Sequence, residues 1–376
     1  MNIVHIVYEP PLAHGSGADL RNLAVGLGLS GVARTNTIAV QDCYGTQKRY
    51  PTRKVSFIEA DLQPVVIADV AGQVARIDPD MVVVDGVFLG DIAKRLIADG
   101  RRVIIDMHNV ESALQQEVDR AKYGWLAALR FRKRWRYAQA AERQLAEIAD
   151  RIWMCSARDV ALMQRIVGDH ILMDVIPNPA PAWCRHAEPH SPPDPWIARA
   201  LFVGHLGYRP NIEAGKRLLH CIQPAIRAVF PDATLDICGR SPGRLLRRHA
   251  AGVPGVTLIG DPADLAPFYA RATVALIPLA QGGGTRLKVL EAMAMGVPVV
   301  ATAKAVEGLD VVPDGTFLLA ETDADFVTAL QRLTADPQLA GRLIDAGRRF
   351  VFEHHGQQTI DLAVRHAIDR RAALDR

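Results

Sequence analysis

One stretch of the chain, residues 282–302, constrains the fold more than any other. Three glycines, residues 282–284, open an apolar helix pattern that Gly296 ends, and strand-like runs lie on both sides, at 274–279 and 299–302. This order predicts a strand–helix–strand unit whose glycines follow the carboxyl end of a parallel strand. Free backbone N–H groups and the helix dipole favour an anion such as phosphate at that place.

One carboxylate, Glu291, stands inside this apolar helix pattern, between Leu290 and Ala292. A buried acid requires a partner, because an unpaired charge is costly to remove from water. Glu291 lies roughly 9 Å along the helix axis from the glycines at 1.5 Å per residue, a reach that suits the separation of a diphosphate from a ribose. The glycines and Glu291 together predict a nucleotide site, and the alternative for Glu291 is a capping or surface carboxylate.

The rest of the chain repeats the alternation of strands and helices on both sides of a proline-rich segment. The pattern predicts strands at 3–7, 37–40, 81–84, 103–106 and 152–155 in the first half, and at 200–203, 234–238, 256–259, 274–279 and 297–301 in the second. We therefore expect an α/β protein with two Rossmann-like domains that face a central cleft. We place the first domain at residues 1–180, a linker at 181–198 and the second domain at 199–355.

Composition excludes several other classes. The chain of 376 residues is 49% hydrophobic and 23% charged, which suits two globular domains. No apolar run reaches the length of a membrane span and no signal-peptide pattern opens the chain, so we expect a cytoplasmic protein. A net charge of +3 does not indicate nucleic-acid binding. The odd, scattered set of cysteines predicts buried free thiols rather than disulfides or zinc sites: Cys43, Cys155, Cys184, Cys221 and Cys238.

Several blocks occur in an order and spacing that resemble the GT-B glycosyltransferases, specifically the group 1 class called glycosyltransferase family 4. In the second half these blocks are 202–206, 235–239, 256–260, 264–274 and the glycine–helix unit, and in the first half they are 105–112, 149–156 and 175–178. The resemblance implies the GT-B fold, with a C-terminal helix at 356–376 that crosses back to pack on the first domain.

The resemblance also implies an activity. A metal-independent hexosyltransferase without a cofactor would move a sugar, with retention, from a nucleotide diphosphate sugar in the second domain to an acceptor in the first. The acceptor would be a saccharide, a lipid-linked molecule or another glycoconjugate, as in polysaccharide assembly. The alternatives are a nucleotide-sugar epimerase or phosphorylase of the same fold, or a catalytically degenerate partner subunit that only binds a nucleotide sugar.

Two positions depart from the family pattern. The family has paired glutamates, and the first would fall at Gly283, so donor-sugar contacts would come from backbone amides at Gly283 and Gly284. His205 stands where many relatives have arginine, so cations for the diphosphate must come from elsewhere. The candidates are Arg209, Arg286 and Lys288, near two helix starts, and a solvated helix residue is the alternative for each.

The resemblance assigns the remaining site residues. Glu291 would bind the ribose, and His108, Arg209 and Lys288 are the catalytic candidates. His108 ends a predicted strand at its carboxyl edge, and the alternative is a core histidine hydrogen-bonded to Asp106 or Asn109. The other donor or nucleotide contacts are Gly283, Gly284, Thr285, Arg286, Leu287, Gly204, Gly239 and Gly260. Gly15, Ser16 and Gly17 are read as an acceptor-side loop, since the full dinucleotide fingerprint is absent.

Some acidic residues have structural interpretations. Asp78 and Asp80 flank Pro79 just before a strand, so a turn explains them better than a metal motif. Asp323 and Asp325 predict a helix start, and Glu111 an N-terminal helix acid. We expect no metal site, because no histidine or cysteine cluster has ligand spacing.

Residues 120–136 contain seven cations and no acid, interleaved with Tyr123, Trp125, Leu126, Leu129, Phe131 and Trp135. Two interpretations stay open for this segment. It is either a basic amphipathic surface for the inner face of an anionic membrane, which suits a lipid-linked acceptor, or a solvated helix face with ordinary aromatic packing.

Overall fold

The structure is a computed structural model that describes residues 1–12, 17–41, 62–186, 197–283 and 286–374. The described chain divides into two compact units. Unit 1 contains the described residues of Met1–Pro179 and Gly356–Arg376 together with Gly283, and unit 2 contains those of Ala180–Gly282 and Arg286–His355. The predicted linker includes residues 187–196, which lie outside the described residues.

Unit 1 is built on a parallel sheet with the strand order β2-β1-β3-β4-β5-β6. The strands are β1 (Asn2–Val7), β2 (Arg34–Ala39), β3 (Met81–Asp85), β4 (Val103–Met107), β5 (Arg151–Met154) and β6 (Met173–Val175). The helices are α1 (Gly17–Ser30), α2 (Pro64–Ile77), α3 (Gly90–Ala98), α4 (Glu111–Tyr123), α5 (Leu126–Ile148), α6 (Ala157–Val167) and α14 (Gln357–Leu374). The prediction of a parallel sheet with alternating helices is confirmed, although it missed the short edge strand β6.

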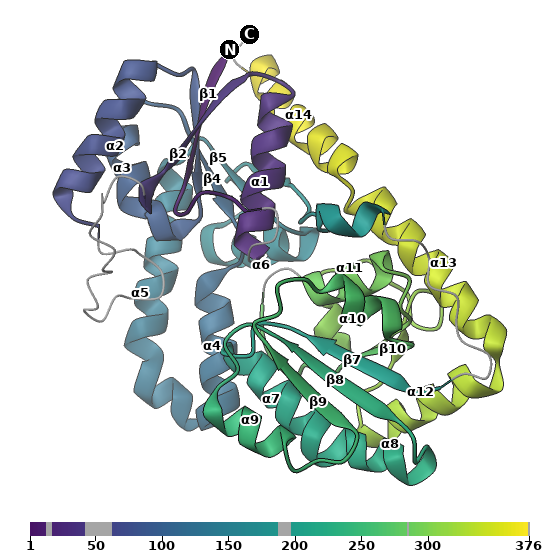
Figure 1. Cartoon of the computed structure of the whole chain (residues 1–376). Helices are drawn as coiled ribbons and strands as arrows, with labels where there is room; N and C mark the ends of the chain where they lie inside the picture. The colour runs from purple at the N-terminus through teal and green to yellow at the C-terminus, as the bar shows by residue number, and fades with distance from the viewer. Residues whose placement is uncertain (13–16, 42–61, 187–196, 284–285, 375–376) are drawn as a thin grey trace. The chain divides into compact units, whose positions relative to one another are not determined.

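Helices cover both faces of this sheet (Figure 1). Val4 and Ile6 pack on one face with residues of α2, α3, α5 and α6, while Ile3 packs on the other with α1 and α14. Helix α14 lies along α1, where a Cβ on Gly28 would approach Val364 to 3.1 Å. The C-terminal helix therefore belongs to the core of unit 1, and each buried aliphatic side chain there contributes about 1.5–3 kcal/mol.

Unit 2 has its own parallel sheet, with the strand order β12-β11-β10-β7-β8-β9. The strands are β7 (Arg199–Val203), β8 (Thr234–Gly239), β9 (Val256–Gly260), β10 (Val274–Ile277), β11 (Val299–Ala301) and β12 (Leu318–Leu319). The helices are α7 (Arg209–Arg217), α8 (Gln223–Val229), α9 (Arg244–Ala250), α10 (Ala266–Arg271), α11 (Leu287–Ala294), α12 (Asp323–Ala335) and α13 (Pro337–His354). The strand–helix–strand unit predicted around residues 282–302 is β10, α11 and β11.

Several smaller predictions can be compared with this fold. Asp78 has a left-handed backbone and Asp80 accepts the Asn2 N–H at 2.7 Å, as the turn interpretation requires. Asp325 forms a capping box with Thr322 at the start of α12, as predicted. The four described cysteines are free thiols, but Cys221 is exposed, so the prediction that these thiols are buried is wrong for Cys221. Cys43 lies outside the described residues.

Candidate functional site

The sheet of unit 2 changes its winding direction between β10 and β7. In open α/β sheets, ligands bind outside the carboxyl ends of the strands at this switch point. Gly204 follows β7 directly, and Gly282 follows β10 with a left-handed φ of +120°. The predicted glycine segment therefore lies where this fold binds ligands.

Close packing against backbone or side-chain atoms explains why glycine occupies three of the predicted positions. A Cβ on Gly239 would lie 1.7 Å from the carbonyl oxygen of Gly204, and one on Gly204 would lie 2.8 Å from the side-chain Nδ2 of Asn211. At the end of β9, a Cβ on Gly260 would lie 2.7 Å from the Arg247 guanidinium. No side chain could be added at these strand ends without displacing a neighbour.

Glu291 lies on α11 and is 8% exposed, so the alternative of a surface carboxylate is wrong. Its Oε2 accepts a hydrogen bond of 2.9 Å from the Tyr269 hydroxyl, on α10. Burial raises the pKa of Glu291, while the Tyr269 hydrogen bond and the nearby Lys288 oppose that rise. Sequence reasoning missed Tyr269, because it lies 22 residues from Glu291.

Two of the predicted cations lie at the starts of α7 and α11. Lys288 Nζ donates to the Asn211 side chain at 3.0 Å and so joins these helix starts. Burial, together with Arg286, lowers the pKa of Lys288 to about 8. Arg209 is the first residue of α7, and its buried Nε finds no hydrogen-bond partner among the described residues. The arrangement concentrates donors and positive charge beside Gly204 and Gly282.

The other predicted residues of this segment have different surroundings. Arg286 is buried, and it donates to the Gly282 carbonyl at 2.9 Å and pairs with Glu307 at 3.2 Å, so its guanidinium fixes the glycine segment. Leu287 begins α11 and is half-buried, as is Gly283. Gly284 and Thr285 lie outside the described residues.

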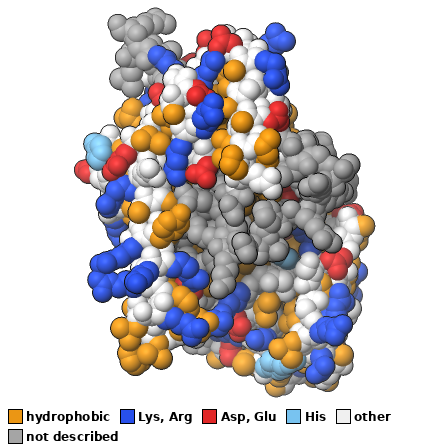
Figure 2. Space-filling view, turned by 90° about the vertical axis from the view of Figure 1, so that its left-hand side faces the viewer, with side chains coloured by type: hydrophobic (Ala, Val, Ile, Leu, Met, Phe, Trp, Pro, Cys, Tyr) orange, Lys and Arg blue, Asp and Glu red, His pale blue; other side chains and the backbone are white. Residues whose placement is uncertain are grey.

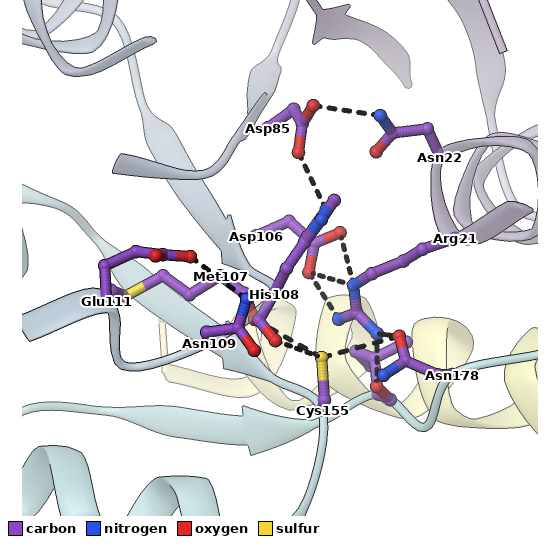
Figure 3. A network of polar contacts seen from close by, with 11 residues as sticks. Arg21, Asn22, Asp85, Asp106, Met107, His108, Asn109, Glu111, Cys155 and Asn178 are labelled. Carbon is purple, nitrogen blue, oxygen red and sulfur yellow. Dashed lines mark hydrogen bonds and ion pairs between the residues drawn. The ribbon is translucent and has the colours of Figure 1, made fainter. Parts of the chain in front are cut away.

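In unit 1 the structure places His108 just after β4, beside Asp85 at the end of β3 (Figure 3). The His108 Nε2 lies 2.8 Å from Asp85 Oδ1, and the Asn22 side chain donates to the other Asp85 oxygen at 2.9 Å. Burial lowers the pKa of His108, but the charge and hydrogen bond of Asp85 outweigh it and raise the net pKa above its ordinary value. The Asp85 carboxylate therefore favours the charged form of His108.

The alternative partners proposed for His108 are wrong, because both are engaged elsewhere. Asp106 is fully buried, and the Arg21 Nε–H is shared between its two oxygens at 3.1 and 3.0 Å, while the Arg21 Nη2 also donates to Oδ1. Arg21 also donates to the Ile176 carbonyl at 2.7 Å and to the Asn178 side chain at 2.9 Å. Asn109 donates to Glu111 at 3.0 Å, at the start of α4. Sequence reasoning did not identify Arg21, Asn22 or Asp85 as members of this network.

The loop that carries His108 is anchored on its other side by α5. Glu142 is fully buried there and accepts the backbone N–H of Ser112 at 3.0 Å, which caps the start of α4. Burial raises the pKa of Glu142 to about 7. Gly17 opens α1, the helix that carries Arg21 and Asn22, while Gly15 and Ser16 lie outside the described residues.

The segment 120–136, which we call the α4–α5 corner, comprises the last residues of α4, the short turn at Gly124 and Trp125, and the first half of α5. Trp125, Leu126 and Leu129 are exposed by 77%, 49% and 74%. Trp135 is buried and donates to Asp119 at 2.8 Å, so the idea that it forms part of the surface is wrong. Arg134 also pairs with Asp119. On the side of the molecule seen in Figure 2, lysine and arginine side chains lie beside exposed hydrophobic ones.

Two features are absent from the described residues. They contain no group of three or more His, Cys, Asp and Glu side chains placed to hold a metal ion. Within the same residues, no helix combines the length and the apolar character that crossing a bilayer requires.

Comparisons with known proteins give the following matches. Residues 198–336 match the family model described as Glycosyl transferases group 1. A sucrose-phosphate synthase from Thermosynechococcus elongatus superimposes with a TM-score of 0.75 at 20% identity, over 99% of each chain. HepE from Anabaena in complex with UDP gives a TM-score of 0.65 at 13% identity, over 98% of this chain and 100% of that one.

A glycosyltransferase from Rickettsia africae ESF-5 gives a TM-score of 0.63 at 13% identity, over 98% of this chain and 97% of its own. HepE has also been solved in complex with UDP-glucose, and that structure gives a TM-score of 0.64 at 12% identity, over 98% of this chain and 100% of that one. A search of curated protein sequences gives no match. The shared architecture is the GT-B fold, as predicted.

Proposed function

We propose that this chain, which carries a group 1 glycosyl transferase domain, moves a sugar from a nucleotide diphosphate sugar to a hydroxyl of an acceptor. The observation that carries the proposal is in unit 2. Buried Glu291, half-buried Lys288 and the buried Arg209 Nε, which has no partner among the described residues, surround the switch point between β7 and β10. This set of groups fits a nucleotide diphosphate, because the carboxylate can accept hydrogen bonds from ribose hydroxyls and the cations can bind the diphosphate.

Each part of the donor has a proposed location. Glu291 binds ribose hydroxyls, and Arg209, Lys288 and the free N–H groups at the start of α11 bind the diphosphate. HepE binds UDP and UDP-glucose with the same fold, which supports a nucleotide-sugar donor. Backbone amides near Gly283 take the place of the missing glutamate at the donor sugar.

The proposed reaction proceeds with retention and needs no protein nucleophile or metal ion. The acceptor oxygen forms a bond to the anomeric carbon as the bond from that carbon to the diphosphate oxygen breaks. The leaving diphosphate takes the acceptor's proton, and Arg209 and Lys288 stabilise the charge that develops on it. His108, as an imidazolium, donates a hydrogen bond to a sugar hydroxyl from unit 1, where we place the acceptor.

A donor panel tests this function. The protein would be incubated with UDP-, GDP-, ADP- and dTDP-linked sugars, with and without saccharide and lipid-linked acceptors, and diphosphate release and product would be followed. Product that depends on an acceptor is expected. Conversion of the donor alone to an isomer would instead indicate an epimerase, and binding without turnover would indicate a degenerate partner subunit.

His108→Ala is expected to leave nucleotide affinity near the wild-type value and to lower turnover about 10- to 150-fold, the range for a hydrogen bond to a charged group. Asp85 and Asp106 raise the pKa of His108, and burial and Arg21 lower it. Because activity needs the imidazolium, turnover falls as pH rises through this raised pKa. Asp85→Asn should move that fall to lower pH, as steady-state pH profiles would reveal.

The exposed histidine His170 provides the control, since it lies in unit 1 away from this network. His170→Ala should keep both the turnover and the pH profile of the wild type. Full turnover of His108→Ala, or an unchanged pH profile in Asp85→Asn, would count against the proposed role of His108.

We further propose that the α4–α5 corner brings the enzyme to an anionic membrane that holds a lipid-linked acceptor. Exposed Trp125, Leu126 and Leu129 provide apolar surface to insert, beside exposed Lys122, Arg130, Arg132, Lys133 and Arg136. Each cation near an anionic bilayer contributes about 1 kcal/mol. Together the apolar and basic side chains favour an inner-face, peripheral location.

Liposome sedimentation tests this surface with vesicles that contain or lack anionic lipid. Changing Arg130, Arg132, Lys133 and Arg136 to glutamine should abolish binding to anionic vesicles, and added salt should weaken binding by the wild type. Arg134 is left unchanged because it pairs with Asp119. The matched control changes the exposed arginines of and near α9, Arg240, Arg244, Arg247 and Arg248.

The control variant should sediment like the wild type. Equal binding by the α4–α5 variant and the wild type, or an equal loss in both variants, would exclude a specific membrane surface at this corner.

A further inference from the structure

The side chain of Glu291 is oriented by one hydrogen bond. Within the described part of the chain, its Oε2 accepts from the Tyr269 hydroxyl at 2.9 Å, and Oε1 accepts no hydrogen bond. Leu290, Ala292 and Met293, the flanking residues on α11, are buried and apolar. Lys288, one turn earlier, donates to Asn211 at 3.0 Å. Tyr269 is therefore the group that fixes the carboxylate.

The ring of Tyr269 is itself tightly held. It is 1% exposed, and the Trp183 ring packs against it with centroids 5.9 Å apart and a tilt of 39°. Trp183 comes from the short turn Ala182–His186, which also contributes the buried Cys184. A phenylalanine would fill the same space, so packing alone does not call for a hydroxyl at this position. A buried hydroxyl is favourable only where it has a partner, and here the partner is Glu291.

Tyr269 is a neutral donor to Glu291. Burial raises the pKa of Tyr269, and the neighbouring Glu291 raises it further, so the phenol keeps its proton. The phenol has a single O–H to donate, and it donates to Oε2 of Glu291 at 2.9 Å. The second oxygen is left as an acceptor.

We propose that Tyr269 is a positioning residue for nucleotide recognition: its hydroxyl holds Oε2 of Glu291, so that Oε1 is presented to a ribose hydroxyl. This inference rests on the proposed function and adds a source of selectivity for ribose. A carboxylate fixed in advance loses less conformational freedom when the nucleotide binds. The contribution of Tyr269 therefore depends on the ribose hydroxyls and on Glu291.

Isothermal titration calorimetry on the full chain tests the proposal. UDP, GDP and ADP would be titrated alongside their 2′,3′-dideoxy counterparts, and the comparison made with the base that binds most tightly to the wild type. We expect the wild type to prefer the ribonucleotide. Glu291→Ala should weaken ribonucleotide binding about 10- to 150-fold and remove that preference.

Tyr269→Phe should weaken ribonucleotide binding about 3- to 10-fold and leave the dideoxynucleotide nearly unchanged, so that the preference narrows. The double variant Tyr269→Phe with Glu291→Ala should bind no more weakly than Glu291→Ala, since Tyr269 acts through the carboxylate. Because the double variant removes the Glu291 carboxylate together with the Tyr269 hydroxyl, no buried carboxylate loses its hydrogen-bond donor. The test therefore stays usable if Tyr269→Phe alone folds poorly. Tyr137→Phe, at an exposed tyrosine on α5, is the matched control.

The possible failures are distinguishable. An unchanged ribose preference in Tyr269→Phe, or an equal loss for both nucleotides, would overturn the positioning role while the proposed function stands. Additive losses in the double variant would overturn it as well. If the wild type binds none of the nucleotides, the proposed function fails first and this inference fails with it.

Discussion

Asp106→Ala is expected to lower the free energy of unfolding of unit 1 by about 3–5 kcal/mol, the cost of removing one partner from a buried ion pair. Arg21 is 1% exposed and Asp106 is fully buried. The guanidinium joins α1 and β4 to the segment that follows β6, through the Ile176 carbonyl and the Asn178 side chain. Without Asp106, its charge would stay buried with only neutral acceptors.

Urea unfolding, followed by circular dichroism and tryptophan fluorescence, measures this effect. The control is Asp91→Ala in the same unit, which breaks the partly exposed Lys94–Asp91 pair at 3.4 Å and should cost about 0.2–1 kcal/mol. The double variant Arg21→Met with Asp106→Leu should recover most of the lost stability, because it leaves no unpaired charge. A wild-type urea midpoint for Asp106→Ala would show that the pair does not stabilise the unit.

Lys288→Ala is expected to lower turnover about 10²- to 10³-fold, the effect of removing one donor to a charge that develops in the transition state. Nucleotide affinity should fall much less, because the charge on the leaving diphosphate grows as the glycosidic bond breaks. Burial and Arg286 lower the pKa of Lys288 to about 8. Activity that requires the ammonium should therefore decline as pH rises through that value.

Steady-state kinetics and calorimetry with the same nucleotide separate turnover from binding. Arg209→Ala should behave like Lys288→Ala, whereas Lys216→Ala provides the control, since Lys216 lies further along α7 and pairs with Glu213 at 3.2 Å. Full activity in both Arg209→Ala and Lys288→Ala would refute the diphosphate role. Loss of activity in EDTA, restored by magnesium or manganese, would refute metal independence.

The sequence alone determined the order of the longer elements in both units, although it missed the short edge strands β6 and β12. Parallel strands buried on both faces read as apolar runs, and glycines and prolines mark their ends, so local patterns were enough to locate β10, α11 and β11. The same local signals identified Glu291, because an acid in an apolar helix pattern is conspicuous. Local patterns also marked the carboxyl ends of the strands, and His108 became a candidate because it follows one of these ends.

The sequence could not determine which polar side chains meet. Arg21 and Asp106 are separated by 85 residues, and Tyr269 and Glu291 by 22. Such pairs depend on strand register and on which helix covers which face of the sheet. The pairing of β3 with β4, for example, places Asp85 opposite Asp106. Sequence proximity made Asp106 a candidate partner for His108, but α1 brings Arg21 to Asp106 and leaves Asp85 for the histidine.

The α4–α5 corner shows the same division. The alternation of basic and aromatic residues predicted a helical segment with an amphipathic character, because helical period is a local property. Which aromatic side chain is exposed depended on the packing of α4 against α5, which buries Trp135 beside Asp119 and leaves Trp125 in solvent. Local pattern therefore determined most elements of this protein, while contacts distant in sequence decided the partners of its candidate site residues.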